Sequence, residues 1–312
     1  MEQRLIISSS PHFRAKTATR NIMLDVLIAL TPALIAATVI FGLRALLLSL
    51  FCVASCMLLE YVYRLVTKQS KTLFDFSAAV TGLLLAFNLP VTLPFWMAFI
   101  GCITAIIVVK QLFGGLGKNF ANPAIVGRIV LLISFAGPMT NWAIPALAGT
   151  GTDALSGATP LVAGVTAGAA SYPYMSMFLG VIGGSLGETC SLALLLGCVY
   201  LFIRKIITPT IPLIFMGTVM LASLALGADP LHQLLSGGLV LGAAFMATDY
   251  TTSPTTERGK AIFALGCGLI TVVIRLYAGY PEGVSFAILI MNIVSPHLDR
   301  LCGLKALGGA KP

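Results

Sequence analysis

Ile22-Met-Leu-Asp-Val-Leu-Ile-Ala-Leu-Thr-Pro-Ala-Leu-Ile-Ala-Ala-Thr-Val-Ile-Phe41 contains one charged residue in twenty, Asp25. A helix of about 20 apolar residues crosses the hydrocarbon core of a bilayer, so this run predicts a transmembrane helix. Nine similar runs follow, at 43–67, 73–89, 93–113, 121–137, 186–206, 211–228, 233–249, 259–277 and 284–302. The chain is 58% hydrophobic and 10% charged, whereas soluble domains carry roughly a quarter charged residues. The sequence therefore predicts an all-α integral membrane protein with about ten transmembrane helices.

Lysine and arginine residues orient these runs. With the N-terminus inside, seventeen of them fall on the inner side: Arg4, Arg14, Lys16, Arg20, Arg64, Lys68, Lys71, Lys110, Lys118, Arg128, Arg204, Lys205, Arg258, Lys260, Arg300, Lys305 and Lys311. Only Arg44 and Arg275 fall outside. Because cytoplasmic loops carry excess Lys and Arg, we expect a cytoplasmic arm at 1–21, a cytoplasmic tail at 303–312 and an external loop at 138–185. The arm lacks the pattern of a signal peptide. The net charge of +8 thus reflects topology and not nucleic-acid binding.

The external loop contains Asp153-Ala-Leu-Ser-Gly-Ala-Thr159. This stretch matches D-x-x-S-G-A-T, the pattern at which a flavin transferase esterifies FMN onto the final threonine. Thr159 would carry the flavin, and Asp153, Ser156, Gly157 and Ala158 would complete the attachment motif. Linkage through the phosphate leaves the isoalloxazine ring free for redox chemistry. The alternative is an ordinary turn, because such small residues also occur together by chance in a Gly/Ala/Thr-rich chain.

The two halves of the chain share short matches in the same order: 77–87 with 236–245, Gly101-Cys102 with Gly266-Cys267, and Phe120-Ala121 with Phe286-Ala287. A unit of five spans is odd-numbered, so its second copy would be inverted in the membrane. We therefore predict two inverted five-helix repeats, 22–137 and 186–302. Inverted repeats tend to form a binding site at their interface, near the bilayer midplane.

Polar loops follow the predicted helices at 93–113 and 233–249. The first contains Lys118, Asn119 and Asn122, and the second contains Thr248, Asp249 and Ser253. Gly, Pro, Asn and hydroxyl residues let the backbone break near the membrane and present polar groups to a ligand. These six residues are candidates for an inner-side site or a second flavin, and turns or caps are the alternative. The Gly114-Gly-Leu-Gly-Lys118 stretch does not have the spacing of a P-loop.

Four acids lie within or at the ends of the predicted helices: Asp25, Asp75, Glu188 and Asp249. A carboxylate inside a membrane is costly unless it is paired or hydrated, so these residues are candidates for an ion path. Structural roles are the alternative: Asp25 would pair with Arg20 or Arg14, and Glu188 would cap a helix. Glu60 precedes Arg64 by four residues, which favours a helix salt bridge.

The seven cysteines fall mostly in apolar runs without C-x-x-C spacing, and the three histidines are scattered. We therefore expect the cysteines to pack inside helices, with no disulfides and no metal site.

Together these motifs resemble the D subunits of the Rnf complexes, ion-pumping ferredoxin:NAD⁺ oxidoreductases, and are similar to the B subunits of Na⁺-translocating NADH:quinone oxidoreductases. The resemblance is carried by Asp153–Thr159, by the Gly/Asn-rich loop at 114–123, by Met-Ala-Thr-Asp-Tyr-Thr-Thr-Ser-Pro at 246–254, and by Gly-Tyr-Pro-Glu-Gly-Val-Ser-Phe-Ala at 279–287. It implies an electron-carrying subunit of a bacterial or archaeal cytoplasmic membrane.

The resemblance also implies particular cofactors and partners. FMN would be covalently bound at Thr159, with room for a second, non-covalent flavin such as riboflavin among the helices. Partners would be the other Rnf subunits, a flavin transferase, lipid, and Na⁺ or H⁺. No dinucleotide fingerprint is present, so the subunit would not reduce NAD⁺ alone. A small-solute channel or transporter of inverted-repeat fold, without a flavin, is the rival interpretation.

Overall fold

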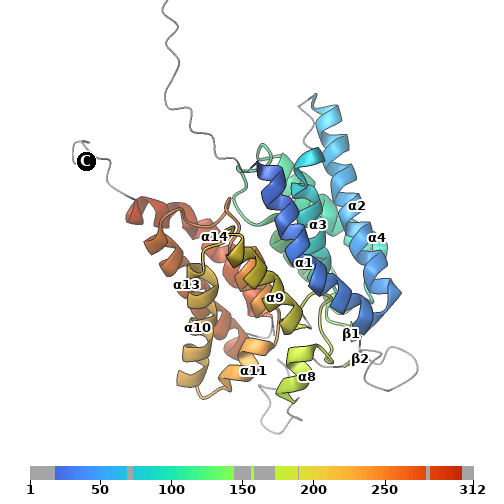
Figure 1. Cartoon of the computed structure of the whole chain (residues 1–312). Helices are drawn as coiled ribbons and strands as arrows, with labels where there is room; N and C mark the ends of the chain where they lie inside the picture. Colours follow the sequence, from blue (N-terminus) through green and yellow to red (C-terminus); the bar gives the residue numbers. More distant parts are fainter. Residues whose placement is uncertain are drawn as a thin grey trace, which may run out of the picture.

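The first half of the chain forms a group of helices on one side of the molecule (Figure 1). The computed structural model describes residues 18–68, 73–143, 156–157, 173–188, 190–278 and 282–303. The elements of this half are α1 (Thr19–Phe41), α2 (Leu43–Val66), the short 3₁₀-helix η1 (Leu73–Asp75), α3 (Ser77–Phe87), α4 (Phe95–Ile103), the π-helix η2 (Thr104–Gln111), α5 (Pro123–Ser134) and α6 (Ala136–Met139).

A two-stranded ribbon and a second group of helices follow. Strand β1 (Trp142–Ala143) pairs antiparallel with β2 (Ser156–Gly157), Trp142 opposite Gly157. The helices of the second half are α8 (Tyr174–Leu179), α9 (Ser191–Ile203), α10 (Thr210–Ala225), α11 (Pro230–Leu235), α12 (Leu239–Leu241), the π-helix η4 (Gly242–Met246), α13 (Glu257–Tyr277) and α14 (Gly283–Cys302).

Among the described residues, four helices are long and apolar enough to cross a membrane: α1, α2, α13 and α14. Five shorter apolar helices accompany them, at Ser77–Phe87, Phe95–Gln111, Pro123–Ser134, Ser191–Ile203 and Thr210–Ala225. Large apolar side chains such as Ile35, Leu43 and Leu221 are exposed on the outer faces of α1, α2 and α10, as expected of surfaces that meet lipid. The prediction of a helical, multi-pass membrane protein is confirmed, while the number of spans stays a prediction.

The predicted helix at 186–206 is wrong at its start. Residues 186–188 are not helical, and α9 begins only at Ser191. Instead, the backbone N–H groups of Leu186 and Gly187 donate to the carbonyls of Leu89 (3.0 Å) and Phe87 (2.9 Å). A Cβ at residue 187 would overlap the Phe87 side chain. Glycine therefore lets two segments from different halves approach closely inside the protein.

The predicted helices at 73–89 and 233–249 are also interrupted. α3 starts at Ser77, after Phe76 in a left-handed conformation (φ 59°). α12 likewise starts after the left-handed Gly238 (φ 62°), and a separate helix, α11, precedes it. Each half thus contains a short helix that begins inside the protein, a feature that sequence hydropathy alone does not reveal.

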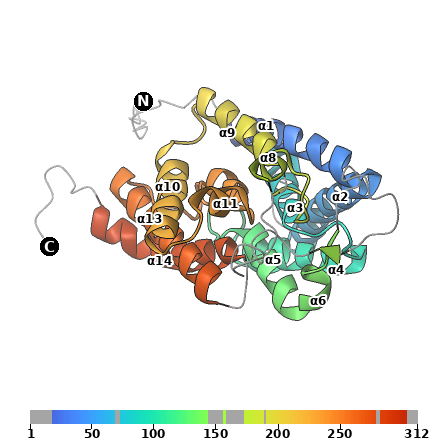
Figure 2. The ribbon, with the colours of Figure 1, turned by 90° about the horizontal axis from the view of Figure 1, so that it is seen from below.

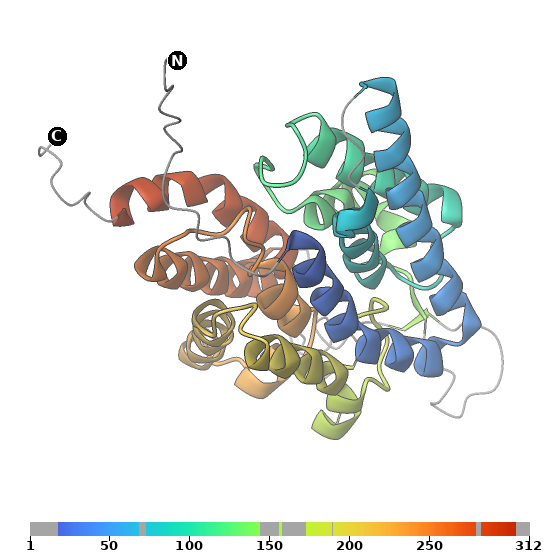
Figure 3. The same ribbon diagram turned by 45° about the horizontal axis from the view of Figure 1, so that its top comes forward.

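The two groups of helices meet along two seams. α1 packs against α9, and α5 packs against α14 (Figure 2). The first turn of α1 and the last turn of α14 lie at one end of the molecule, and β1 and β2 lie at the opposite end (Figure 1). In the tilted view, α2 (light blue) borders one edge and α14 (red) borders another (Figure 3). All seven cysteines are free, and most are buried in helices, as expected for packing residues.

Candidate functional site

A cavity of about 730 Å³, counting its open mouth, lies between the two halves. Its lining includes residues of α1, α3, η2, η4 and the loops after η2 and η4. Four of the six polar loop candidates line it: Asn119, Asn122, Thr248 and Asp249. The structure therefore brings together residues from two loops more than a hundred positions apart in the chain. We call this cavity, with Lys110, Glu60 and Ser77 in and behind its wall, the cavity site.

The other two loop candidates lie outside the lining. Lys118 is exposed to solvent. Ser253 is half-buried, and its backbone N–H donates to the carbonyl of Asp249 (3.0 Å).

Asn122 fixes the geometry between the two loops. It caps α5, because its Oδ1 accepts from the backbone N–H of Ala124 (3.0 Å) and Pro123 occupies the first helical position, a favourable start for a helix. Its Nδ2 donates across the interface to the carbonyl of Met246 (3.2 Å). Asn119 is also buried, but its Oδ1 has no hydrogen-bond partner among the described residues.

Asp249 and Thr248 contribute the second half of the lining. The Asp249 carboxylate accepts from the backbone N–H (3.2 Å) and the hydroxyl (3.0 Å) of Thr251. The Thr248 hydroxyl donates to the carbonyl of Ala244 (2.7 Å), one turn back. Of the four acidic ion-path candidates, only Asp249 lines the cavity.

Lys110, which the charge rule places in a cytoplasmic loop, is buried in the cavity wall at 1% exposure. Its Nζ donates to Glu60 Oε2 (2.9 Å) and to the Ser77 hydroxyl (2.6 Å). Glu60 also accepts from Gln111 Nε2 (2.9 Å) and lies 3.5 Å from Arg64 Nε. The predicted Glu60–Arg64 pair is confirmed, but it belongs to a larger buried cluster.

Asp75 and Asp25 hold helix ends and seams near the cavity site. Asp75 Oδ1 accepts from the backbone N–H (2.9 Å) and hydroxyl (2.7 Å) of Ser77, at the start of α3. Asp25 pairs with Arg204 (3.0 Å) and accepts from the Tyr200 hydroxyl (2.9 Å), which ties α1 to α9. The alternative pairing of Asp25 with Arg20 is wrong, because Arg20 lies over the Phe76 ring instead.

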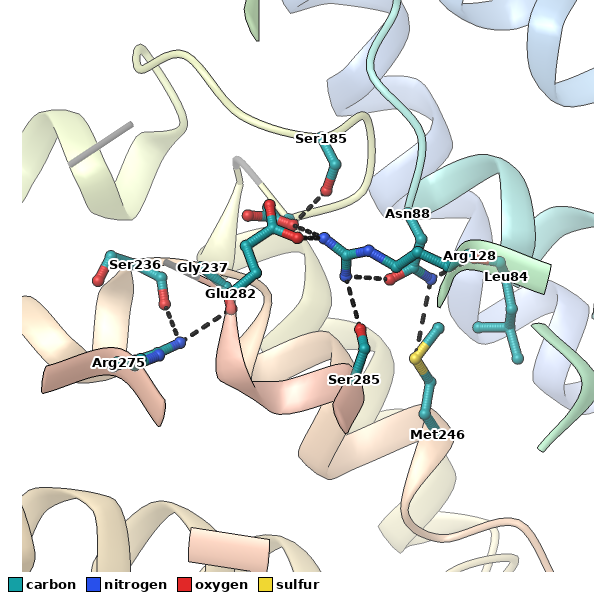
Figure 4. Close-up of polar contacts among 11 residues, drawn as sticks. Leu84, Asn88, Arg128, Ser185, Ser236, Gly237, Met246, Arg275, Glu282 and Ser285 are labelled. Atoms are coloured by element: carbon teal, nitrogen blue, oxygen red, sulfur yellow. Dashed lines mark hydrogen bonds and ion pairs between the residues drawn. The ribbon is translucent and has the colours of Figure 1, made fainter. Parts of the chain in front are cut away.

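A second buried cluster lies where the interrupted segments of both halves meet (Figure 4). Arg128 of α5, at 4% exposure, donates from Nη1 to Asn88 Oδ1 (2.8 Å) and to the Ser285 hydroxyl (3.0 Å). Its Nη2 forms an ion pair with Glu282 and lies 3.8 Å from Glu188 Oε2. Glu188, the remaining ion-path candidate, also accepts from the Ser185 hydroxyl. Glu188 therefore lies in a network of buried charges and does not line the cavity.

Arg275 adjoins this network (Figure 4). Its two terminal nitrogens donate to the carbonyls of Gln233 (2.6 Å), Ser236 (2.9 Å) and Gly237 (2.9 Å), and to Gln233 Oε1 (3.1 Å). We call Arg128, Glu188, Arg275 and Glu282, with their partners, the closed site. The sequence did not predict that these four charged residues lie close together. Charged residues within apolar runs were the available signal, but the charge rule assigned Lys110, Arg128 and Arg275 to membrane surfaces.

The attachment motif is only partly described. Asp153, Ala158 and Thr159 lie outside the described residues. Ser156 and Gly157 form β2, whose backbone pairs with β1. Gly183, from the segment that leads to Glu188, lies close to this ribbon: a Cβ there would be 3.6 Å from Trp142 Cβ.

Apolar helices, some of them interrupted, and buried ion pairs between two helical groups define a polytopic membrane protein with polar groups in its interior. The chain belongs to the NQR2, RnfD, RnfE family, whose model matches residues 6–308.

Its relatives include named components of redox complexes. The chain is 47% identical to the D subunit of the Na(+)-translocating ferredoxin:NAD(+) oxidoreductase complex of Acetobacterium woodii, over 99% of this chain and 97% of that protein. It is 42% identical to the D subunit of the proton-translocating ferredoxin:NAD(+) oxidoreductase complex of Clostridium ljungdahlii, over 94% and 93%. The D subunit of the ion-translocating oxidoreductase complex of Escherichia coli is 38% identical, over 98% and 99%.

Proposed function

We propose that this chain is the electron-carrying membrane subunit of an ion-translocating ferredoxin:NAD⁺ oxidoreductase complex and that it carries FMN on Thr159. Family membership and near full-length similarity to the D subunits of such complexes support the first part. The observation that carries the second part is the D-x-x-S-G-A-T stretch at 153–159. Ser156 and Gly157 of this stretch form β2, which pairs with β1.

The threonine hydroxyl suits this linkage. Its oxygen would be linked to the FMN phosphate as a phosphodiester, which would leave the ring system free to supply one- and two-electron chemistry. The β1–β2 ribbon would hold the attachment segment against the segment around Gly183. The protein's own contribution is therefore to position the ring near the end of the helices that β1 and β2 occupy.

We infer further that the two helical groups are inverted repeats. A two-fold relation brings equivalent elements against each other, and here α1 packs on α9 and α5 on α14. Arg275 follows Lys110 by 165 positions, the same offset that separates Gly101 from Gly266. The predicted orientation, with both termini cytoplasmic and the flavin loop outside, agrees with the location of the start of α1 and the end of α14 at one end of the molecule.

The cavity site is our candidate for a non-covalent flavin such as riboflavin. Its lining combines apolar side chains, such as Ile22, Met23 and Phe245, with polar ones, such as Lys110 and Asn119. The unpaired, buried Asn119 oxygen fits a ligand that donates a hydrogen bond. An amphipathic, planar ring would match both kinds of side chain.

Translocation would involve Na⁺ or H⁺ and the other subunits of the complex. The relatives carry names of both kinds, Na(+)-translocating and proton-translocating, so the coupling ion stays open. Asp25, Asp75, Glu188 and Asp249 remain ion-path candidates. Among them Asp249 is favoured, because it lines the cavity and carries oxygen ligands around it.

A small-solute channel or transporter is the second candidate, and the interrupted helices α3 and α12–η4 favour it. The closed site argues against it. Arg128 and Glu282 pair at the junction of both halves, where a solute path between the repeats would pass.

The test is to express the chain with a flavin transferase and examine it on a denaturing gel for flavin fluorescence. We expect a fluorescent band in the wild type and none in Thr159→Ala. Thr166→Ala, in the same predicted loop, is the matched control and should stay fluorescent. A dark wild-type band, with the transferase active on a control protein, would reduce the motif to a turn and favour the channel.

A further inference from the structure

Lys110 places a buried positive charge in the wall of the cavity. Its ammonium donates to Glu60 Oε2 (2.9 Å) and the Ser77 hydroxyl (2.6 Å). A lysine ammonium has three N–H donors, so one donor remains beyond these two described partners. Because Lys110 lines the cavity, the remaining donor is available to a ligand there.

The opposing charge of Glu60 is shared among several donors. Glu60 accepts from Lys110 and from Gln111 Nε2, and Arg64 lies 3.5 Å away. This cluster holds two cations for one carboxylate. Lys110 is the cation of this cluster that lines the cavity.

Two acidic groups near the cavity are already engaged. Asp249 lines the cavity, and both of its carboxylate oxygens interact with Thr251. Asp75 stands behind Ser77 and accepts two hydrogen bonds from it. Neither carboxylate forms an ion pair with Lys110 among the described residues, although Asp249 interacts with the Lys110 charge at longer range.

Asn119 supplies an independent sign of a ligand. It lines the same cavity, is buried, and its Oδ1 has no partner among the described residues. A buried amide oxygen without a hydrogen bond is costly. The cavity thus offers one unused donor and one unused acceptor. The pyrimidine edge of a flavin is complementary to this pair, because it carries an N–H between two carbonyl oxygens.

We propose that Lys110 stabilises the negative charge that a flavin in the cavity acquires on reduction, and that Lys110 thereby sets the reduction potential of that flavin. This inference rests on the proposed function, since it takes the cavity ligand to be the non-covalent flavin. One electron from the complex adds one negative charge to the ring, and no proton needs to accompany it. Lys110 keeps its own proton throughout. The charges interact strongly because water is largely excluded from the wall.

The test uses the assembled complex and follows flavin spectra during a redox titration. Lys110→Gln should lower the potential of the non-covalent flavin and leave the covalent flavin unchanged. A tenfold loss in the relative stability of the reduced ring corresponds to about 59 mV for a one-electron step. Glu60→Gln should shift the potential in the opposite direction, because it removes the countercharge. Lys110→Arg should retain the wild-type value.

Lys205→Gln is the matched control, since Lys205 is exposed and adjoins Ile206 of the lining. Its charge is screened by solvent, so no shift is expected. If Lys110→Gln fails to assemble, Glu60→Gln alone keeps a hydrogen-bonding side chain beside Lys110 and should still raise the potential.

Two results would overturn the inference. One is an unchanged potential in a Lys110→Gln or Glu60→Gln complex that retains the flavin. The other is a wild-type complex that releases no flavin on denaturation, which would mean that the cavity holds none. Covalent attachment of FMN is tested separately, by the fluorescent gel band that Thr159→Ala should remove.

Discussion

Lys110 and Arg275 lie 165 positions apart, and each fixes the start of a short interrupted helix. Lys110 donates to the Ser77 hydroxyl at the start of α3, and Arg275 donates to the Ser236 carbonyl just before α12. Their surroundings differ. Lys110 borders a cavity, whereas the terminal nitrogens of Arg275 are bonded to four oxygen acceptors and its buried Nε has no partner among the described residues.

The two basic side chains suit two different roles, one in stability and one in ligand binding. A guanidinium has a rigid fork of five donors and saturates a cluster of backbone carbonyls. An ammonium is a compact point charge whose spare donor can serve a ligand. The closed site therefore holds the two halves together, and the cavity site is available to a ligand. Variants of the closed site should act on stability, and variants of the cavity site should act on ligand properties.

The largest effect on stability is expected from Arg128→Leu. The change leaves the buried Glu282 and Glu188 carboxylates without their cation. Breaking a buried pair in this way costs about 3–5 kcal/mol. Thermal unfolding of the purified protein in detergent would measure the loss. The double variant Arg128→Gln/Glu282→Gln should recover part of it, because no unpaired charge remains at that pair. Wild-type stability in Arg128→Leu would contradict a structural role for the closed site.

A somewhat smaller loss is expected from Arg275→Met. Three backbone carbonyls lose their donor, and at the lower end of the cost of an unsatisfied buried acceptor, about 1 kcal/mol each, we expect a loss of about 3 kcal/mol. Arg44→Met is the matched control. Arg44 also donates to two carbonyls, of Val91 (2.9 Å) and Thr92 (3.1 Å), but it is exposed. Water can replace it, so its unfolding temperature should change little. Equal losses in both variants would remove the distinction between buried and exposed arginines.

The positions of the long helices could be predicted from the sequence, but the points at which other helices are interrupted could not. Apolar runs locate α1, α2, α13 and α14 closely, because lipid demands long, apolar helices. The non-helical residues 186–188 are hidden in such a run, since Leu186 and Gly187 are as apolar as a helix requires. Their conformation depends on Phe87 and Leu89, which lie about a hundred positions away.

Some of the site residues could likewise be identified from the sequence, and others could not. Asn119, Asn122, Thr248 and Asp249 were identifiable because polar loops are conspicuous in an apolar chain. Lys110, Arg128 and Arg275 were not, because the positive-inside rule treats every basic residue as a surface charge. Burial of a cation depends on a partner from another helix, and a single sequence does not reveal which helices meet.

The smallest of the three effects on stability is expected from Gly187→Ala, and it probes why the closed site is closed. A Cβ at this position would overlap Phe87, and overpacking of this kind costs about 1–3 kcal/mol. Gly217→Ala in α10 is the control, since a Cβ there meets nothing within 4 Å. That variant should be neutral or slightly stabilising, as alanine favours helix. Because Gly187 precedes Glu188, the overlap should also displace the Glu188 carboxylate from Arg128. We therefore expect Gly187→Ala and Arg128→Leu together to lose less than the sum of their separate losses. Full additivity would place the two residues in independent parts of the molecule and would separate the glycine contact from the ion pairs.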